Sequence, residues 1–278
     1  MQPRKSSFAL NVVKGAAVMI VLLSALGAFA QTAPIVTDLY DFSSGPGPYC
    51  NGMVFDTKGN LYANNWGGGA SDGGQIFEFT PPAEAGGSWT ETTLYSFDPH
   101  STTVKDGYAP CGSLAIDSKG NLYGTTLNGG TNGTGTVYEL SPPAEGGTTW
   151  TETILYNFGA AGSNDGYNPV AGVTLASSTA TTLYGTTVCG GTGPAVGTEM
   201  GGSYMDIPYG FGCSNGSGTV YELSYTKPTK KNNGGWKESV LYNFGATSAT
   251  DGSLPSGALA LKGKNLYGTT TGGGNGAY

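Results

Sequence analysis

The sequence predicts an all-β protein built from repeated units of four short strands. A motif around Leu-Tyr recurs along the 278 residues and is complete, as Asn-Leu-Tyr-Gly-Thr-Thr, at 121–126 and 265–270. Its four tyrosines are Tyr62, Tyr123, Tyr184 and Tyr267, of which the first three lie 61 residues apart. The segments between the copies show no helical spacing of apolar residues. A fixed period of this length is typical of architectures in which identical units stack on one another.

One repeat can be divided into four expected strands, which we call A to D. In the second repeat these strands are expected at 113–117, 122–127, 136–140 and 150–158. A tight turn joins A to B, a glycine-rich loop joins B to C, and Pro142-Pro143 end C because proline cannot donate to a ladder. Strict alternation along D would place four apolar side chains on one face, namely Trp150, Ile154, Tyr156 and Phe158.

Four antiparallel strands per unit describe the blade of a β-propeller. Full blades are expected at about 50–97, 111–158 and 170–244, with a partial fourth at 254–278. Residues 35–42 match strand D, so this segment can complete the sheet of the last blade and close a ring. The chain is then either a fragment of a longer propeller or a compact four-bladed ring with a damaged last blade. The fragment is favoured, because a chain end that cuts a strand leaves an unpaired edge.

The first 30 residues have the pattern of a secretory signal peptide. A basic start is followed by an apolar run over 16–30, and Ala28-Phe29-Ala30 is a small-x-small cleavage site before Gln31. The alternative is a retained signal anchor. We therefore expect residues 1–30 to be a signal, residues 31–278 to form the repeat domain, and the mature protein to be secreted or held at the cell surface.

The charge of the chain limits its partners. The whole chain carries a net charge of −7, and removing the three basic residues of the signal gives −10. An acidic surface disfavours nucleic acid and anionic membranes, and is compatible with neutral glycans or cations. No later segment approaches 18 apolar residues, so no membrane span is expected after signal cleavage.

The four cysteines predict disulfides in an exported protein. Cys189 and Cys213 bracket the long insertion at 188–218, and we expect them to pair. Cys50 and Cys111 occupy equivalent positions of adjacent repeats and pair only if those positions face each other. No metal site and no cofactor are predicted, because the single histidine, His100, is not near a CxxC pair.

A binding face is expected where the B–C and D–A connections emerge together. This face collects carboxylates and aromatic rings, which suit a sugar because rings stack on pyranose faces and carboxylates accept hydroxyl hydrogen bonds. The candidate ligand-binding residues are Trp66, Asp106, Tyr108, Asp165, Tyr167, Tyr204, Asp206 and Tyr209. The alternative is structural, since Asp-Gly is a common turn pair and strand tyrosines commonly pack between sheets.

No catalytic constellation is visible, so no catalytic residue is assigned. The expected function is a non-catalytic propeller that binds an extracellular glycan or protein. The alternative is a propeller hydrolase or lyase acting on an extracellular carbohydrate or lactone, which a pair of converging carboxylates with raised pKa would favour. Finding only aspartates buried in turns would argue against it.

The repeat resembles the GloVer repeat (Gloeobacter–Verrucomicrobia type) of exported bacterial proteins. The resemblance covers nearly all of 35–278 and rests on the ordered motifs at 122–126, 136–140 and 155–159. It implies an extracellular propeller-like protein without established activity. The first repeat departs from the pattern, with Ala63-Asn64-Asn65-Trp66 in place of Gly-Thr-Thr-x. The motif is also similar to gluconolactonase-like and NHL-type propellers, but their axial metal ligands have no matching set in this sequence.

Overall fold

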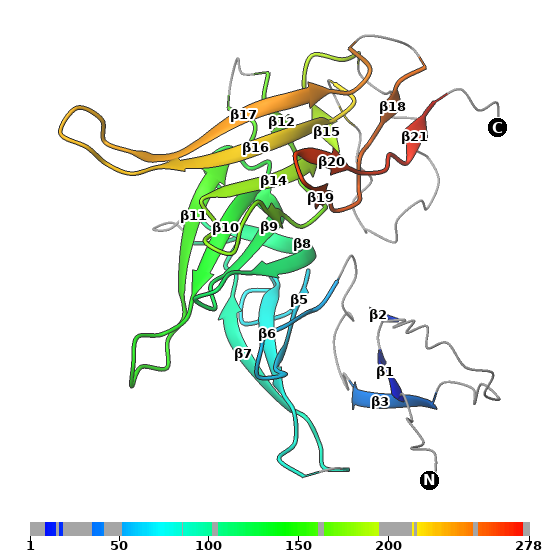
Figure 1. The fold of residues 1–278 in the computed structure, drawn as a ribbon, viewed down its shortest axis with the longest axis vertical. Coiled ribbons are helices and arrows are strands. Elements are labelled where there is room, and N and C mark those ends of the chain that lie inside the picture. The colour runs from blue at the N-terminus through cyan, green and yellow to red at the C-terminus, as the bar shows by residue number, and fades with distance from the viewer. Residues whose placement is uncertain are drawn as a thin grey trace.

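The computed structural model describes residues 9–14, 17–18, 35–41, 52–84, 86–101, 105–160, 164–194, 213, 216–246 and 250–274. All regular elements within these ranges are β-strands, and none is a helix. The prediction of an all-β chain is confirmed, as a set of small, mostly antiparallel sheets (Figure 1). No closed ring of sheets is found among the described strands.

Three four-stranded sheets correspond to the first three repeats, and we call them the first, second and third sheet. Each has its strands in the sequential order that the repeat predicts. The first sheet contains β4 (Val54–Phe55), β5 (Leu61–Asn65), β6 (Gln75–Thr80) and β7 (Thr90–Ser96). The second contains β8 (Gly107–Ile116), β9 (Leu122–Gly129), β10 (Thr136–Ser141) and β11 (Thr151–Asn157). The third contains β13 (Thr174–Leu175), β14 (Thr182–Thr187), β16 (Thr219–Thr226) and β17 (Gly235–Asn243).

The remaining antiparallel pairs are short. β19 (Ala260–Lys262) and β20 (Asn265–Tyr267) form the A–B hairpin of the fourth repeat. β12 (Gly166–Tyr167) pairs with β15 (Cys189–Gly190), and β18 (Gly252–Ser253) pairs with β21 (Gly272–Gly273). In the second sheet the same pairing is part of β8, which is why β8 begins before the expected strand A.

The A–B turns of the first two repeats are fixed by an aspartate. Asp117 Oδ1 accepts hydrogen bonds from the amides of Lys119 (2.8 Å) and Asn121 (3.0 Å). Its Oδ2 accepts from the Asn121 side chain (3.0 Å) and the Tyr123 hydroxyl (3.2 Å). Asp56 makes the same set of contacts in the first repeat. In these two repeats the Asn-Leu-Tyr motif therefore carries the partners of the turn aspartate, and local hydrogen bonding accounts for its asparagine and tyrosine there.

Aromatic side chains hold successive sheets against one another. Phe97 follows β7 and meets Tyr138 of β10 edge to face, with ring centroids 5.3 Å apart. Phe158 follows β11 and meets Tyr221 of β16 in the same way, at 5.1 Å. All four rings are fully buried. Burying a ring of this size contributes about 2–3 kcal/mol, so these junctions are main sources of stability.

A β-bulge in strand D corrects the predicted alternation. Val137 pairs with Tyr156, whereas Tyr138 pairs with Ile154, so Leu155 is an extra residue in β11. The bulge reverses the faces beyond it. Trp150 and Ile154 pack toward the first sheet, while Tyr156 and Phe158 pack toward the third. The bulge recurs in the other two sheets at the leucine of the same motif. Strand D of the second sheet therefore divides these four side chains between its two neighbours, whereas strict alternation would place all four on one face.

A glycine and a tyrosine are matched across strands B and C. Gly124 of β9 lies opposite Tyr138, and a Cβ at Gly124 would clash with the Tyr138 hydroxyl. Gly185 and Tyr221 have the same relation in the third sheet. The first sheet has Ala63 opposite Phe77, which lacks the hydroxyl. In the first repeat, alanine replaces the glycine and phenylalanine replaces the tyrosine. The methyl group of Ala63 is thus accommodated because Phe77 has no hydroxyl.

The N-terminal segment differs from the expected arrangement. β3 (Ile35–Asp41) was expected to complete the last blade, but it pairs in parallel with β1 (Ala9–Lys14), which also pairs with β2 (Ala17–Val18). The expected pairing with the fourth repeat is therefore absent, and β19–β20 remains a two-stranded sheet. The partner of β3 is β1, which lies within the predicted signal and precedes its apolar run.

Candidate functional site

The D–A and B–C connections lie side by side, and we call this end of the sheets the loop edge. Gly107 pairs with Gly129, Gly166 with Gly190, and Gly252 with Gly273, in three successive repeats. In each pair, the first glycine follows the aspartate of an Asp-Gly turn and the second follows strand B. The loop edge is therefore continuous from one repeat to the next, as the strand order predicted.

Each B–C loop also docks on the D–A segment of the following repeat. The amide of Ala109 donates to the Gly73 carbonyl (2.8 Å), that of Asn168 to Thr134 (2.9 Å), and that of Leu254 to Ser217 (2.9 Å). These three donors have positive φ, between 55° and 57°. A non-glycine residue in this conformation is uncommon, so the recurring contact fixes the loop edge in one geometry. These positions could not be recognised from the sequence, because their residue types differ.

The aspartates of the loop edge act as buried acceptors. Asp106 Oδ2 accepts from the Tyr95 hydroxyl (3.2 Å) and the Asp98 amide (3.0 Å). Asp165 Oδ2 accepts from the Tyr156 hydroxyl (2.9 Å) and the Gly159 amide (3.0 Å). Both side chains are 7% exposed. Desolvation raises the pKa of both carboxyls, although these hydrogen bonds act in the opposite direction. Their contacts match the structural alternative considered for the Asp-Gly pairs.

The aromatic candidates are half-buried at the loop edge. Trp66 of the first B–C loop and Tyr108 of the second D–A segment pack against one cluster, whose buried members are Ala109, Cys111, Leu127 and Val170. Tyr167, one repeat later than Tyr108, packs beside the Cys189–Cys213 pair. Three rings therefore lie along successive repeats at one end of the sheets, each with part of its surface accessible.

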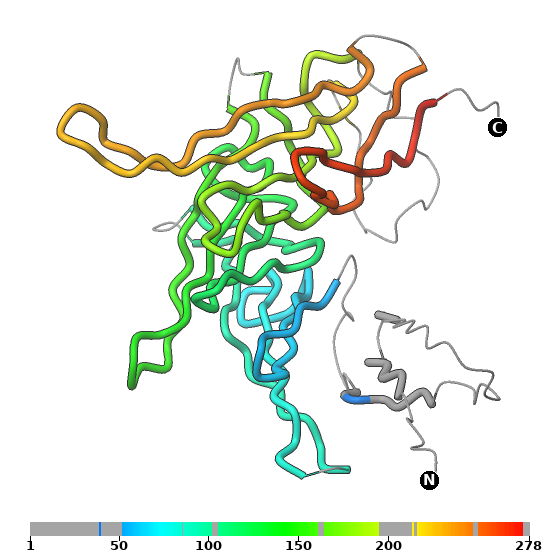
Figure 2. The backbone as a smooth tube through the Cα atoms, viewed as in Figure 1, coloured from blue at the N-terminus to red at the C-terminus, as the bar shows by residue number. Residues whose placement is uncertain are grey.

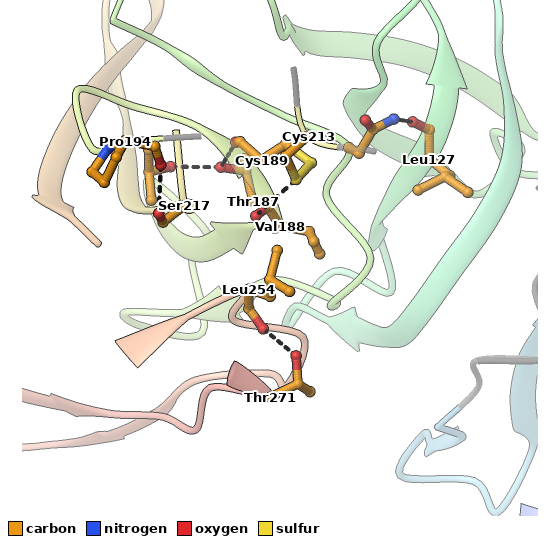
Figure 3. Close-up of a disulfide and its surroundings, with 11 residues drawn as sticks. Leu127, Thr187, Val188, Cys189, Pro194, Cys213, Ser217, Leu254 and Thr271 are labelled. Atoms are coloured by element: carbon orange, nitrogen blue, oxygen red, sulfur yellow. Dashed lines mark hydrogen bonds between the residues drawn. A yellow bond between two sulfur atoms is a disulfide. The ribbon is translucent and has the colours of Figure 1, made fainter. Parts of the chain in front are cut away.

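The predicted disulfide between Cys189 and Cys213 is present, with a Cα–Cα distance of 5.2 Å (Figure 3). Cys189 lies in β15, and both cysteines are buried next to Leu254 of the following repeat. The bond closes a sequence separation of 24 residues. Closing a loop of this length stabilises a fold by about 3 kcal/mol in the chain-entropy model.

Several predicted residues lie outside the described ranges. Tyr204, Asp206 and Tyr209 of the insertion belong to this group, so their place in the site stays a prediction. Cys50 also lies outside it, while Cys111 is buried in the cluster that holds Trp66. The pairing of Cys50 with Cys111 therefore stays a prediction as well.

The described part of the chain contains neither a metal-ligand cluster nor a helix that could span a membrane. No group of three or more His, Cys, Asp or Glu side chains that could hold a metal ion occurs there. Within the same residues, no helix has the length and apolar character needed to cross a membrane.

Comparison with protein-family models and with curated proteins finds no match. No protein-family model matches the chain, and no curated protein is similar to it. The resemblance to GloVer repeats therefore stays a prediction that rests on the quoted motifs.

Proposed function

We propose that this chain is an exported β-propeller that binds an extracellular glycan through the loop edge, without catalysis. The observation that carries the proposal is the placement of Trp66, Tyr108 and Tyr167, three half-buried rings at the same edge of successive repeats. Flat, partly accessible rings in fixed positions suit the apolar faces of sugars, because little conformational entropy is lost on binding.

The repeated stacking supports the assignment of the sheets as blades. The three sheets have the same strand order, and the same aromatic contact joins each to the next. Their C–D hairpins point in successively rotated directions in the backbone trace (Figure 2). Successive rotation of similar sheets is what a propeller requires.

Export is supported by the disulfide and by the N-terminal sequence. Disulfides persist in oxidising compartments outside the cytosol. Cleavage after Ala30 would remove β1 and β2 and leave β3 without its present partner. The released edge of β3 would then be available to another sheet, as the expected ring closure needs. N-terminal sequencing of the secreted protein tests this step, and a mature chain that begins at Gln31 is the expected result.

The rings, and not the loop-edge aspartates, are the proposed sugar contacts. Asp106 and Asp165 are buried and each holds a tyrosine hydroxyl. Buried turn aspartates argue against the hydrolase or lyase alternative. Two pairs of neighbouring carboxyls with raised pKa, Asp106 with Glu152 and Asp165 with Glu238, are the feature that this alternative predicts, so it stays the second candidate function. An extracellular protein stays the other class of partner that the sequence allows.

A glycan array with the mature chain tests the proposal. We expect retention of a glycan, and a loss of affinity of about tenfold for Trp66→Ala or Tyr167→Ala, from the loss of ring stacking. Tyr267→Ala removes an exposed ring from β20, away from the three rings, and should bind as the unchanged chain does. Thermal unfolding of each variant checks that it folds.

Two outcomes would overturn the proposal. One is the absence of retention on any glycan. The other is equal affinity of the unchanged chain and the ring variants. Release of a shortened product from a retained glycan would favour the hydrolase or lyase alternative instead.

A further inference from the structure

The hairpin between β16 and β17 concentrates positive charge in an acidic protein. Lys227, Lys230, Lys231 and Lys237 are four of the 12 basic residues of a chain whose net charge is −7. No acidic residue lies among them between 225 and 237. All four lysines are exposed, and the hairpin extends away from the stacked sheets (Figure 1). We call residues 225–237 the basic hairpin.

The tip of the basic hairpin is a fixed tight turn. Thr229 and Asn232 pair across it, through amide-to-carbonyl hydrogen bonds of 2.7 Å and 3.3 Å. The Lys231 amide also donates to the Thr229 hydroxyl (3.3 Å), and the Gly234 amide donates to Asn232 Oδ1 (2.9 Å). Lys230 and Lys231 occupy the two central positions of this turn. Their ammonium groups are thus presented next to each other at the end of a supported strand pair.

The equivalent hairpins of the first two sheets carry the opposite charge. Both have a Pro-Pro-Ala-Glu segment, in which Glu84 and Glu145 are exposed, followed by two adjacent glycines and a tryptophan. The third hairpin keeps the glycines and the tryptophan but has lysines in place of the acidic segment. The change is therefore confined to the solvent-facing tip, where packing in the repeat places no constraint on charge.

An aromatic pair lies at the base of this charged tip. Tyr225 pairs with Trp236 across the two strands, and their ring centroids are 5.5 Å apart. Tyr225 is 39% exposed, Trp236 is half-buried, and Lys227 comes two residues after Tyr225. Partly exposed rings at the base of a lysine-rich tip are complementary to a sugar that carries a carboxylate or sulfate. We propose that the basic hairpin binds an acidic polysaccharide.

The charge distribution favours a flexible linear polyanion over an anionic membrane. The rest of the chain has a net charge of −11, so a broad negative surface would be repelled by the protein as it approached. A single polysaccharide chain needs to contact only the projecting hairpin. This interaction does not depend on the loop edge, because it uses a different part of the repeat.

Binding of the mature chain to two polysaccharide probes, heparin and polygalacturonate, tests the proposal by calorimetry at several salt concentrations. We expect affinity to fall as salt rises, because the ion pairs are exposed and screened. The triple variant Lys227→Gln, Lys230→Gln, Lys231→Gln should lose about ten- to a hundredfold in affinity, from three exposed ion pairs. Tyr225→Ala should lose about threefold to tenfold, from the loss of stacking.

A matched control removes the same charge elsewhere. Lys58→Gln, Lys119→Gln and Lys262→Gln together change the net charge by the same amount at exposed turns of other repeats. This variant should retain binding to within about threefold, because only weak long-range attraction is lost. Equal losses in the two triple variants would overturn the proposal.

Two further probes, inorganic polyphosphate and vesicles of phosphatidylglycerol, test whether the basic hairpin recognises a polysaccharide or any negatively charged ligand. Weaker binding to both, and no effect of Tyr225→Ala on either, would support polysaccharide recognition. Equal or tighter binding to polyphosphate or to vesicles would overturn it, since charge alone would then explain the interaction.

Discussion

The junction between the first and second sheets and the junction between the second and third sheets are each covered by a sheet on both sides, and we call them closed junctions. The face of the third sheet that carries Leu241 and Tyr242, which we call the open face, is more exposed to solvent. Leu155 and Leu241 are the bulge residues of equivalent strands, but Leu155 is 8% exposed and Leu241 is 48% exposed. Tyr242 is likewise 40% exposed. The same motif therefore occurs in two environments, and the comparison separates what the motif determines from what its neighbours determine.

Two loop-edge aspartates, Asp165 and Asp251, accept equivalent hydrogen bonds but have pKa shifts in opposite directions. Asp251 accepts from the Tyr242 hydroxyl (2.8 Å) and the Gly245 amide (2.9 Å), as Asp165 does from its own tyrosine and glycine. Desolvation is the largest influence on both, yet the pKa of Asp165 is raised and that of Asp251 is lowered. At the open face the hydrogen bonds together outweigh a small desolvation. Hydrogen bonding is thus encoded locally, whereas the direction of the pKa shift depends on stacking.

A glutamate from the following sheet completes each closed junction. Glu152 of β11 lies on the same face as Tyr138, and Glu238 of β17 has the same relation to Tyr221. Desolvation, with a smaller contribution from the nearby Asp106, raises the pKa of Glu152 to about 8. Desolvation and Asp165 raise the pKa of Glu238 to about 7. These glutamates were missed in the sequence, although each recurs four residues before the tyrosine of strand D.

The largest expected difference comes from truncating the ring at each junction. Phe158→Ala should lower the free energy of unfolding by about 4 kcal/mol, because the ring is fully buried against Tyr221. Phe244→Ala at the open face should cost about 1 kcal/mol, since that ring is only half-buried. Urea unfolding measures both. Equal costs would show that the two faces are equally covered in solution.

The disulfide is expected to have the next largest effect. It lies beside Leu254 at the open face, where ring stacking contributes least. Replacing Cys189 and Cys213 with serine should lower the free energy of unfolding by about 3 kcal/mol, as loss of the cross-link increases the entropy of the unfolded chain. The measurement is urea unfolding without reductant. A cost below about 1 kcal/mol would mean that the loop is held by its other contacts.

A substitution at strand B tests the matched glycine and tyrosine. Gly124→Ala should cost about 2–3 kcal/mol, because its Cβ would meet the buried Tyr138 hydroxyl. Tyr138→Phe in the same chain should restore part of the loss, because it removes the hydroxyl while the ring carbon Cζ stays close to the added Cβ. Gly268→Ala meets only a leucine side chain and should cost less. Additive effects of the two substitutions in the double variant would contradict this explanation.

The smallest expected effect is a dependence of stability on pH. The folded pKa of Glu152, about 8, lies above its ordinary value of 4.5, so protonated Glu152 stabilises the closed junction. This stabilisation is complete below pH 4.5 and is lost as pH rises through 8. Its size is on the order of 2 kcal/mol after solvent screening.

Replacing each glutamate in turn distinguishes the contributions of the two junctions to the pH dependence of stability. Glu152→Gln should make the free energy of unfolding less dependent on pH up to about 8, and Glu238→Gln should do so up to about 7. Unfolding in urea across this pH range measures both variants. A pH profile that neither substitution changes would show that these carboxyls are ionised and solvated in the folded protein.

Sequence reasoning was most successful where contacts are local. The strand order, a tight A–B turn at 118–121 and the pairing of Cys189 with Cys213 were all predictable, because each depends on a short pattern or on a bracketed insertion. The role of Asp117 in that turn was not predicted. The candidate site was predictable in part. The loop edge followed from strand order, but the role of Asp106 as the acceptor for Tyr95 depends on the tertiary structure.

The sequence by itself determined the repeat, its four-strand unit and the position of its tight A–B turn, since these depend on alternation and on the types of a few neighbouring residues. Only the tertiary structure decided which face each side chain of strand D occupies, because the bulge at Leu155 depends on pairing with β10. It also decided the partner of β3 and the opposite pKa shifts of Asp165 and Asp251. The physical reason is that desolvation and edge pairing arise from segments distant in the chain, whose contacts no local pattern records.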